Sequence, residues 1–370
     1  MNEFEEIIDP KKIPKPLIEN PYQSIIMWSE RRFKLIGERL FSYISLMPHS
    51  IFIPEMPYED TSFKCGISLL FLSPAGGAKS MVSDAIREIC INPFSFEDIT
   101  SSEIQTELQG KNFITMIVGD AGRIFKDFDL LKVIEGVISD SRVSRRTKRE
   151  RLDYDVIGNA YMAGVPQDLT AYLSSGYLSR FVPISVLHKR DQQDKIGKSI
   201  VDSLGRKVDK SSEAITIGDI KDYYRFLWQM QQGLQAKNGF PKIKGYHFSN
   251  EFKSQIYGMW KNYRQKADTL KFTNYYRELI SGFKFLFASA FLHIHQREVR
   301  DGLLVPNKDD LKIALYLQHN ELRTKIHMLR NKKVARNIES VEYLEKVSSE
   351  MGINQVDMEM LRILVEGKNN

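Results

Sequence analysis

The 370-residue sequence lacks several features that would assign it to a special class of protein. It has only two cysteines, Cys65 and Cys90, and neither has a partner at metal-ligand spacing, so we expect no disulfide framework and no zinc site. No apolar run approaches the roughly 20 residues that a membrane-spanning helix needs. The start of the chain, MNEFEE, is acidic and lacks the basic and apolar regions of a signal peptide. We therefore expect a protein of the reducing cytoplasm with no membrane partner.

The remaining composition is that of an ordinary globular protein. Hydrophobic residues make up 42% of the chain and charged residues 27%, a common balance for a folded soluble protein. The length allows two domains, or one large domain with an appendage. The net charge of +6 permits a polyanionic partner but does not demonstrate one.

One stretch of the sequence has the pattern of a phosphate-binding loop. An unbroken apolar run ends at Leu72, small residues follow, and Lys79-Ser80 begins a segment with helical spacing of apolar residues. Such a strand, loop and helix present backbone N–H groups to an anion, while the lysine contacts the terminal phosphates and the hydroxyl binds Mg²⁺. A polar turn before a helix is the alternative. The nucleotide-binding residues expected are Pro74, Ala75, Gly76, Gly77, Ala78, Lys79 and Ser80.

The ending Gly76-Gly77-Ala78-Lys79-Ser80 resembles the phosphate loop of the minichromosome maintenance (MCM) helicases, a branch of the AAA+ ATPases that also has alanine before the lysine. Ser73 departs from that family, which has glycine at this position. The resemblance implies an α/β fold of the AAA+ P-loop NTPase type. In that fold a parallel sheet is sandwiched by helices and is followed by a C-terminal α-helical lid.

A second apolar run, Phe113–Val118, is expected to form a buried strand that leads into Gly119-Asp120. A carboxylate at such a strand end can hold Mg²⁺ and polarise the attacking water. The family has two adjacent acids here. We align Asp120 with the second, catalytic acid, because the following Gly122-Arg123-Ile124 then falls on the family's small charged turn. If Asp120 takes the first position instead, Ala121 fills the catalytic one and hydrolysis could be lost.

A basic segment follows the amphipathic helix expected from Phe128 to Ser139. Residues 141–151 form the densest basic run in the chain, and such runs are often only solvated loops. In MCM-like proteins, however, a hairpin inserted at this point projects into the ring channel and contacts DNA phosphates. That contact is independent of sequence and sensitive to salt. The DNA-binding residues that the resemblance implies are Arg142, Arg145, Arg146, Lys148 and Arg149.

The remaining motifs follow the order of the AAA+ family. Val156–Val165 is expected to be a core strand, with Asn159 as the candidate for the polar sensor that contacts the nucleotide and Gln167 as the fallback. Leu178-Ser179-Arg180-Phe181 resembles the MCM arginine-finger motif, in which an arginine acts on the ATP of the neighbouring subunit. Arg277, at the head of an apolar helix, matches the lid arginine that contacts the nucleotide.

These motifs predict four parts: an extended N-terminal arm (1–21), the AAA+ core (22–245), a helical lid (246–330), and a helical appendage (331–370) that could belong to a winged helix. The predicted function is an ATP- and Mg²⁺-dependent DNA motor, a replicative MCM-like helicase. It would work as a hexameric homo-oligomer alongside other replication proteins, with Lys79, Asp120 and Arg180 as its catalytic residues.

Two other functions stay open. The chain could be an ATP-binding switch or helicase loader with weak or no hydrolysis, which the missing second acid and Ser73 favour. It could also be a DNA-binding scaffold, which would have no affinity for nucleotide.

Overall fold

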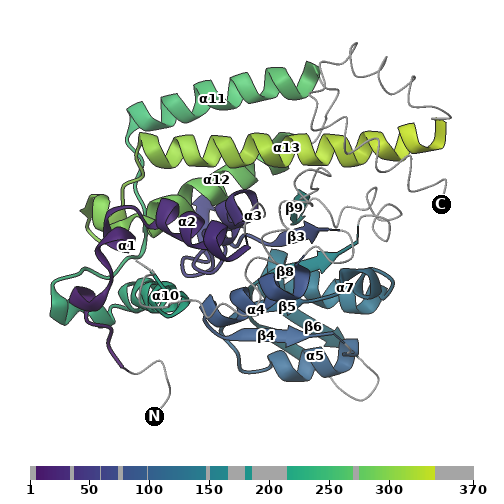
Figure 1. Ribbon diagram of the computed structural model, residues 1–370, viewed down its shortest axis with the longest axis horizontal. Helices are drawn as coiled ribbons and strands as arrows, with labels where there is room; N and C mark the ends of the chain where they lie inside the picture. The colour runs from purple at the N-terminus through teal and green to yellow at the C-terminus, as the bar shows by residue number, and fades with distance from the viewer. Residues whose placement is uncertain are drawn as a thin grey trace, which may run out of the picture.

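The computed structural model describes residues 6–33, 37–58, 60–73, 78–97, 99–146, 151–165, 180–185, 215–269 and 275–337. A central sheet lies beside a layer of long helices (Figure 1), of which α13 (Lys308–Asn337) contacts the sheet strand β9 (Val182–Ser185) directly. Residues 74–77, between strand β3 (Leu69–Leu72) and helix α4 (Lys79–Ile89), lie outside the described residues, although the residues on both sides of them are described.

The central sheet has five strands, all parallel, in the order β4-β5-β8-β3-β9. The strands are β3 (Leu69–Leu72), β4 (Pro93–Phe96), β5 (Phe113–Val118), β8 (Ile157–Gly164) and β9 (Val182–Ser185). The three inner strands are almost continuously buried, which explains their apolar sequences, since both faces of a parallel sheet are covered. The three strands predicted from apolar runs are therefore confirmed.

Helices cover both faces of this sheet. Along the strands, alternate side chains enter two different buried clusters: Leu70 and Met116 lie in one, and Phe71 and Ile117 lie in the other. The first cluster also holds side chains of α5 (Ser101–Leu108), α6 (Ala121–Ile124) and α7 (Phe128–Glu135), and the second holds side chains of α4 (Lys79–Ile89) and α10 (Ile217–Gln232). The predicted α/β class with a helix-flanked parallel sheet is confirmed.

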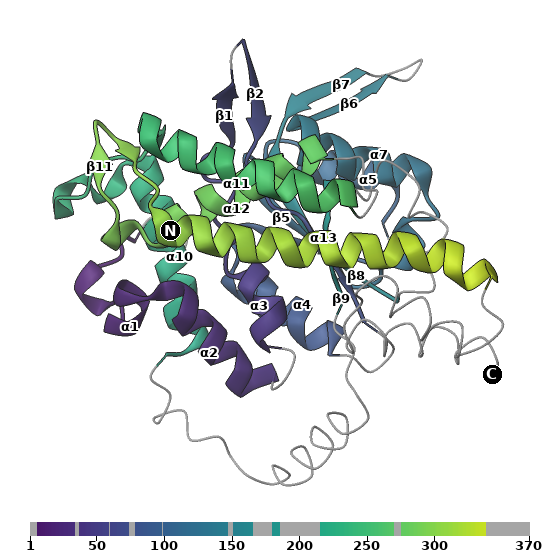
Figure 2. The same cartoon turned by 90° about the horizontal axis from the view of Figure 1, so that it is seen from above.

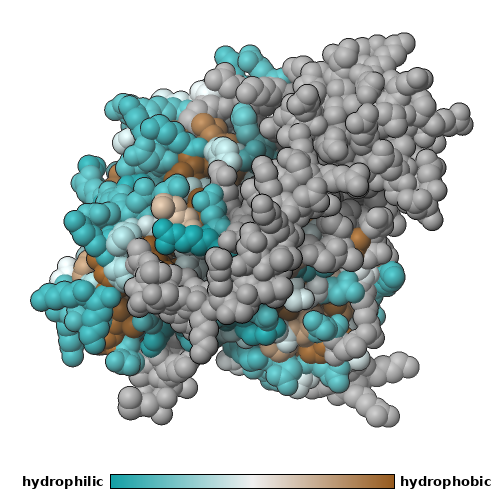
Figure 3. Space-filling view, in the orientation of Figure 1, coloured by the Kyte–Doolittle hydropathy of each residue, from teal (hydrophilic) through white to brown (hydrophobic). Residues whose placement is uncertain are grey.

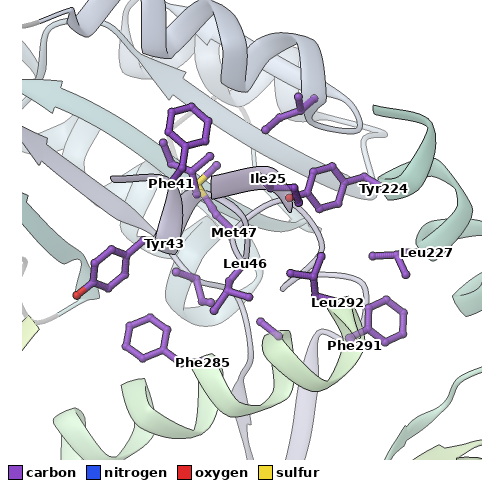
Figure 4. Packing of buried hydrophobic residues seen from close by; sticks show 14 of the residues in the cluster. Ile25, Phe41, Tyr43, Leu46, Met47, Tyr224, Leu227, Phe285, Phe291 and Leu292 are labelled. Atoms are coloured by element: carbon purple, nitrogen blue, oxygen red, sulfur yellow. The ribbon is translucent and has the colours of Figure 1, made fainter. Parts of the chain in front are cut away.

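The N-terminal and C-terminal helices pack together on the α4 side of the sheet. They are η1 (Pro10–Lys12), α1 (Lys15–Glu19), α2 (Pro21–Phe33), α3 (Gly37–Ile44), α11 (Asn250–Thr269), α12 (Tyr275–Leu292) and α13 (Lys308–Asn337). Figure 4 shows Tyr43 and Phe285 converging from α3 and α12. The Tyr43 hydroxyl also donates to the Leu317 carbonyl of α13 at 2.8 Å. Segments far apart in the chain therefore share one core.

The described part of the predicted N-terminal arm is packed against the protein rather than extended. Ile13 and Leu17 are buried in the second cluster. The buried amide of Gln229 binds the backbone on both sides of Ile7, accepting from the Ile8 N–H at 3.0 Å and donating to the Glu6 carbonyl at 2.8 Å. The proline and lysine content of this segment suggested a linker, but two apolar side chains one helical turn apart anchor it.

The C-terminal half does not break at the predicted boundaries. Near residue 245, β10 (Gly245–Tyr246) pairs with β12 (Leu303–Leu304), which also pairs with β11 (Val299–Arg300). The helix α13 continues through residue 330 to Asn337. Two short turns, η6 (Leu234–Asn238) and η7 (Ile294–Gln296), complete this half. The predicted appendage from 338 onward lies outside the described residues.

Two β-hairpins project from the body (Figure 2). The first pairs β1 (Glu55–Tyr58) with β2 (Thr61–Lys64), and the second pairs β6 (Arg142–Arg146) with β7 (Arg151–Asp155). The π-helical turn η3 (Gly136–Asp140) leads from α7 into the second hairpin. The described residues of the basic run therefore lie in a hairpin, as the resemblance implies.

The surface visible in Figure 3 is mostly hydrophilic where its residues are described, and its apolar patches are small and scattered. In the described ranges, no helix has both the length and the apolar character needed to cross a bilayer.

Candidate nucleotide site

The candidate phosphate loop connects the end of β3 to the start of α4, at the carboxyl edge of the sheet. Lys79 is the first residue of α4, and its ammonium group donates to the carbonyl of Ser73 at 3.0 Å. The lysine side chain therefore connects the start of α4 to the residue that follows β3. The hydroxyl-bearing Ser80 follows on the first turn and is exposed. Residues 74–77, which complete the predicted loop, lie outside the described residues.

Ala78 places the helix start in a conformation that alanine rarely adopts. Its φ of 58° lies in the left-handed region, which costs an L-residue with a Cβ about 1–2 kcal/mol. Its methyl side chain cannot cap the helix, so no side-chain oxygen covers the first N–H groups of α4. Buried Val82, Ala85 and Ile86 hold the helix against the sheet and thereby fix the direction of its N-terminus. An anion at this end would be favoured by the helix dipole.

Asp120 follows β5 at the same edge of the sheet. Its side chain is exposed, and its Oδ1 accepts the backbone N–H of Gly122, the second residue of the short helix α6, at 3.0 Å. Ala121 is fully buried, so it faces the core and not the edge. Strands β3 and β5 are separated only by β8, which puts their ends about 10 Å apart.

Glu97 is a second carboxylate at this edge that sequence reasoning missed. It directly follows β4, which pairs with β5 so that Phe96 lies opposite Val118. Glu97 therefore comes next to Gly119, and a Cβ built on Gly119 would lie 2.7 Å from the Glu97 Oε1. The alternation of Phe94, Ser95 and Phe96 directly before Glu97 is the sequence signal of a short strand that ends in an acid.

Asn159 does not lie where a nucleotide sensor would be needed. It is the third residue of β8, about 16 Å from the strand's end at Gly164. Its side chain is fully buried, with Oδ1 accepting from Thr115 Oγ1 at 2.8 Å and Nδ2 donating to the Met47 carbonyl at 2.7 Å and to Ser50 Oγ at 3.3 Å. The amide joins the sheet to the segment after α3. Its assignment as a nucleotide contact is therefore corrected to a structural role.

Arg180 lies at the amino-terminal ends of the sheet strands, whereas the phosphate loop follows the carboxyl end of β3. It precedes β9, whose Val182 pairs with Leu69 at the start of β3. Its half-buried guanidinium forms an ion pair with Glu135, at the end of α7. Arg180 therefore points away from the nucleotide site of its own chain.

The lid arginine and the fallback sensor are less fully described. Arg277 lies in the first turn of α12, as predicted for a helix head, but its side chain is outside the described residues. Gln167 lies outside them altogether.

The basic hairpin carries its charges unevenly. Arg142 forms a two-point ion pair with Asp153 across the hairpin, with Nε 2.6 Å from Oδ1 and the second contact between Nη2 and Oδ2. This pairing raises the pKa of the Arg142 guanidinium, through the hydrogen bond first and the charge of Asp153 second. The backbones of Arg145 and Arg146 belong to β6. The last two predicted DNA contacts, Lys148 and Arg149, lie in the tip outside the described residues.

The donor set suits magnesium better than a metal held by protein alone. Among the described residues, no group of three or more His, Cys, Asp or Glu side chains could hold a metal ion. Mg²⁺ in nucleotide sites usually takes one or two carboxylates, with phosphates and waters supplying the rest. Asp120 and Ser80 are exposed oxygen donors of that kind, so the residues present fit the group.

The comparisons with known proteins do not identify the chain. A scan against models of protein families finds no match, and a search of curated proteins finds none either. The functional assignment therefore depends on the residues and geometry described above.

Proposed function

We propose that the chain is a P-loop ATPase that binds Mg²⁺-ATP at the carboxyl edge of its central sheet. The observation that carries this proposal is the position of Lys79. From the first residue of α4, its ammonium donates to the carbonyl of Ser73, the residue that follows β3. A phosphate entering the loop would replace that carbonyl with a fully charged partner, which binds the ammonium more strongly.

The surrounding groups support the same assignment. The uncapped N-terminus of α4 favours an anion, and the Ser80 hydroxyl and the Asp120 carboxylate provide oxygen donors for Mg²⁺. Only β8 separates β3 from β5, so the residues that follow these two strands belong to the same edge of the sheet, about 10 Å apart. When bound, the metal would neutralise charge on the phosphates, while Lys79 positions them.

We further propose that the chain works as a homo-oligomer, in which Arg180 completes the site of the neighbouring copy. Arg180 precedes the amino-terminal end of β9, which pairs with the amino-terminal end of β3. Its guanidinium is therefore too distant to contact a phosphate at its own loop, which follows the carboxyl end of β3. Its partner Glu135 holds the guanidinium at that amino-terminal end. A ring of copies, hexameric by the MCM resemblance, would bring this end against the carboxyl edge of the next subunit.

DNA is the proposed substrate of the motor, contacted by the projecting hairpin of β6 and β7. The hairpin stands out from the body (Figure 2), and its tip belongs to the densest basic run of the chain. Because Arg142 is paired with Asp153, we assign the DNA contact to Arg145, Arg146 and the residues of the tip. We propose helicase activity in replication on the resemblance to the MCM family.

A second candidate function is an ATP-binding switch or helicase loader that hydrolyses ATP slowly. One observation favours it: only one acid, Asp120, ends β5, and one of its oxygens already accepts the Gly122 N–H. Measured turnover separates the two candidates, because the switch would bind ATP without DNA-stimulated hydrolysis or strand separation.

The test of the motor is ATP hydrolysis by the purified protein, with and without DNA. Lys79→Ala should abolish hydrolysis, whereas Lys253→Ala, which removes an exposed lysine of α11, should leave it unchanged. DNA should stimulate the wild type, and Arg145→Ala with Arg146→Ala should reduce the salt dependence of DNA binding by about one to two in log–log slope. Hydrolysis that survives Lys79→Ala would refute the assignment.

A further inference from the structure

Gly119 and Glu97 occupy neighbouring positions at the carboxyl edge of the sheet. Gly119 directly follows β5 and Glu97 directly follows β4, and the pairing of Val118 with Phe96 sets them side by side. A Cβ on Gly119 would meet the Glu97 side chain at three atoms: Oε1 at 2.7 Å, Cδ at 3.6 Å and Cγ at 3.8 Å. The Glu97 carboxylate therefore covers the bare α-carbon of Gly119.

This contact places the Glu97 carboxylate where a side chain at residue 119 would begin. A separation of 2.7 Å is shorter than real Cβ contacts allow, so a residue with a Cβ at 119 would move the flexible, exposed end of the Glu97 side chain aside. Conversely, the carboxylate occupies the space that an acidic side chain at 119 would use. If Asp120 is the second acid of the strand, position 119 is where the first acid should be.

We propose that Glu97 supplies, from the neighbouring strand, the metal-directed carboxylate that β5 lacks. This inference rests on the proposed ATPase function and deepens it. Glu97 and Asp120 then form a carboxylate pair contributed by two adjacent strands instead of by two adjacent residues. Glu97 is exposed, and it also lines an open hollow of about 280 Å³ beside α5 and α7, so solvent and ions reach its carboxylate.

The chemistry of the pair agrees with magnesium as the ion. Mg²⁺ prefers oxygen ligands and is commonly bound by one or two carboxylates together with substrate phosphates. One carboxylate from Asp120 and one from Glu97 meet that requirement, with Ser80 on the phosphate side. Glu97 would thus help Asp120 to hold the metal on the phosphates.

The test compares the affinity of the protein for a fluorescent ATP analogue, mant-ATP, with Mg²⁺ and with EDTA. Glu97→Gln keeps the size of the side chain and removes its charge. It should reduce the Mg²⁺-dependent gain in affinity on the order of 10-fold and leave the affinity in EDTA unchanged. Glu107→Gln is the matched control, because Glu107 is an exposed carboxylate on α5 and should behave as wild type.

A relocation variant makes the test specific. Gly119 does not require a left-handed backbone, and the exposed end of the side chain at 97 can turn away from a Cβ at 119, so Gly119→Asp is compatible with the chain conformation. The double variant Glu97→Gln with Gly119→Asp should regain most of the Mg²⁺-dependent affinity. Melting temperatures of all variants establish that they are folded.

The outcomes separate this inference from the proposed function. If Glu97→Gln retains the full Mg²⁺-dependent gain, or loses affinity equally in Mg²⁺ and EDTA, the role of Glu97 is refuted while ATP binding through Lys79 stands. If the wild type binds mant-ATP with no gain from Mg²⁺, the role of Glu97 is also refuted. If the wild type does not bind the nucleotide at all, the proposed function fails and this inference fails with it.

Discussion

Mixing two inactive variants of this chain is expected to restore part of its ATPase activity. Lys79→Ala removes the phosphate-binding lysine but leaves Arg180 intact, and Arg180→Ala does the reverse. In an oligomer in which Arg180 acts on the neighbouring site, one kind of interface in the mixture pairs an intact Lys79 with an intact Arg180. Random assembly of equal amounts makes about one quarter of all sites complete.

The geometry of the sheet excludes the alternative in which Arg180 acts within its own chain. Val182 pairs with Leu69, and Ser73, which binds the Lys79 ammonium, lies four residues further along. With Arg180 two residues before Val182, the separation along the strand direction is about 20 Å. An arginine side chain cannot span that distance. An arginine supplied in trans contributes about 10³-fold or more in rate, so each variant alone should be essentially inactive.

The assay is ATP hydrolysis by each variant alone and by mixtures taken through dissociation and reassembly. The wild type mixed with Lys253→Ala serves as the control for the procedure, since that exposed lysine has no part in the site. Activity of the mixture near one quarter of the wild type supports the arrangement. Inactive mixtures from subunits shown to exchange would refute it, as would an Arg180→Ala protein with normal turnover.

Three further predictions concern stability. Burial lowers the pKa of His49 to about 4, against 6.5 in the unfolded chain. Between these two pH values the unfolded state therefore binds more protons than the folded state. About 3 kcal/mol of folding stability that is present above pH 6.5 should be lost as the pH falls to 4. Urea unfolding should show a shallower pH dependence for His49→Phe than for the wild type, and equal slopes would contradict this. Ala78→Gly should relieve left-handed strain and raise stability by up to about 1 kcal/mol, seen as a higher Tm; a lower Tm would argue against strain. Arg297→Met should cost about 3–5 kcal/mol, because it leaves the fully buried Asp310 carboxylate without its two-point partner, whereas Arg300→Met on the exposed surface should cost little.

The three inner strands of the sheet and the position of the loop after β3 could be predicted from the sequence, because each depends on the pattern of apolar and small residues within one short segment. The run Phe113–Val118 is apolar without interruption since both faces of β5 are buried. The same rule identified β8 and the end of β3. Asp120 then followed as the exposed residue at a strand end, which requires no knowledge of the rest of the fold.

Features that depend on which strands are neighbours could not be predicted in this way. Strand β4 is short and lies at the edge of the sheet, with most of its side chains partly exposed, so its sequence has no apolar run. Its pairing with β5, which brings Glu97 beside Gly119, is a tertiary contact. Asn159 shows the opposite error: the residue type fitted a sensor, but its place at the start of β8 buried it among hydrogen-bond partners.

Equilibrium titration of the purified chain with Mg²⁺-ATP tests the central claim most directly. The account predicts saturable binding at one site per chain that is lost in Lys79→Ala and retained in Lys253→Ala. Equal binding by the wild type and Lys79→Ala, or no binding by a folded wild type, would contradict it.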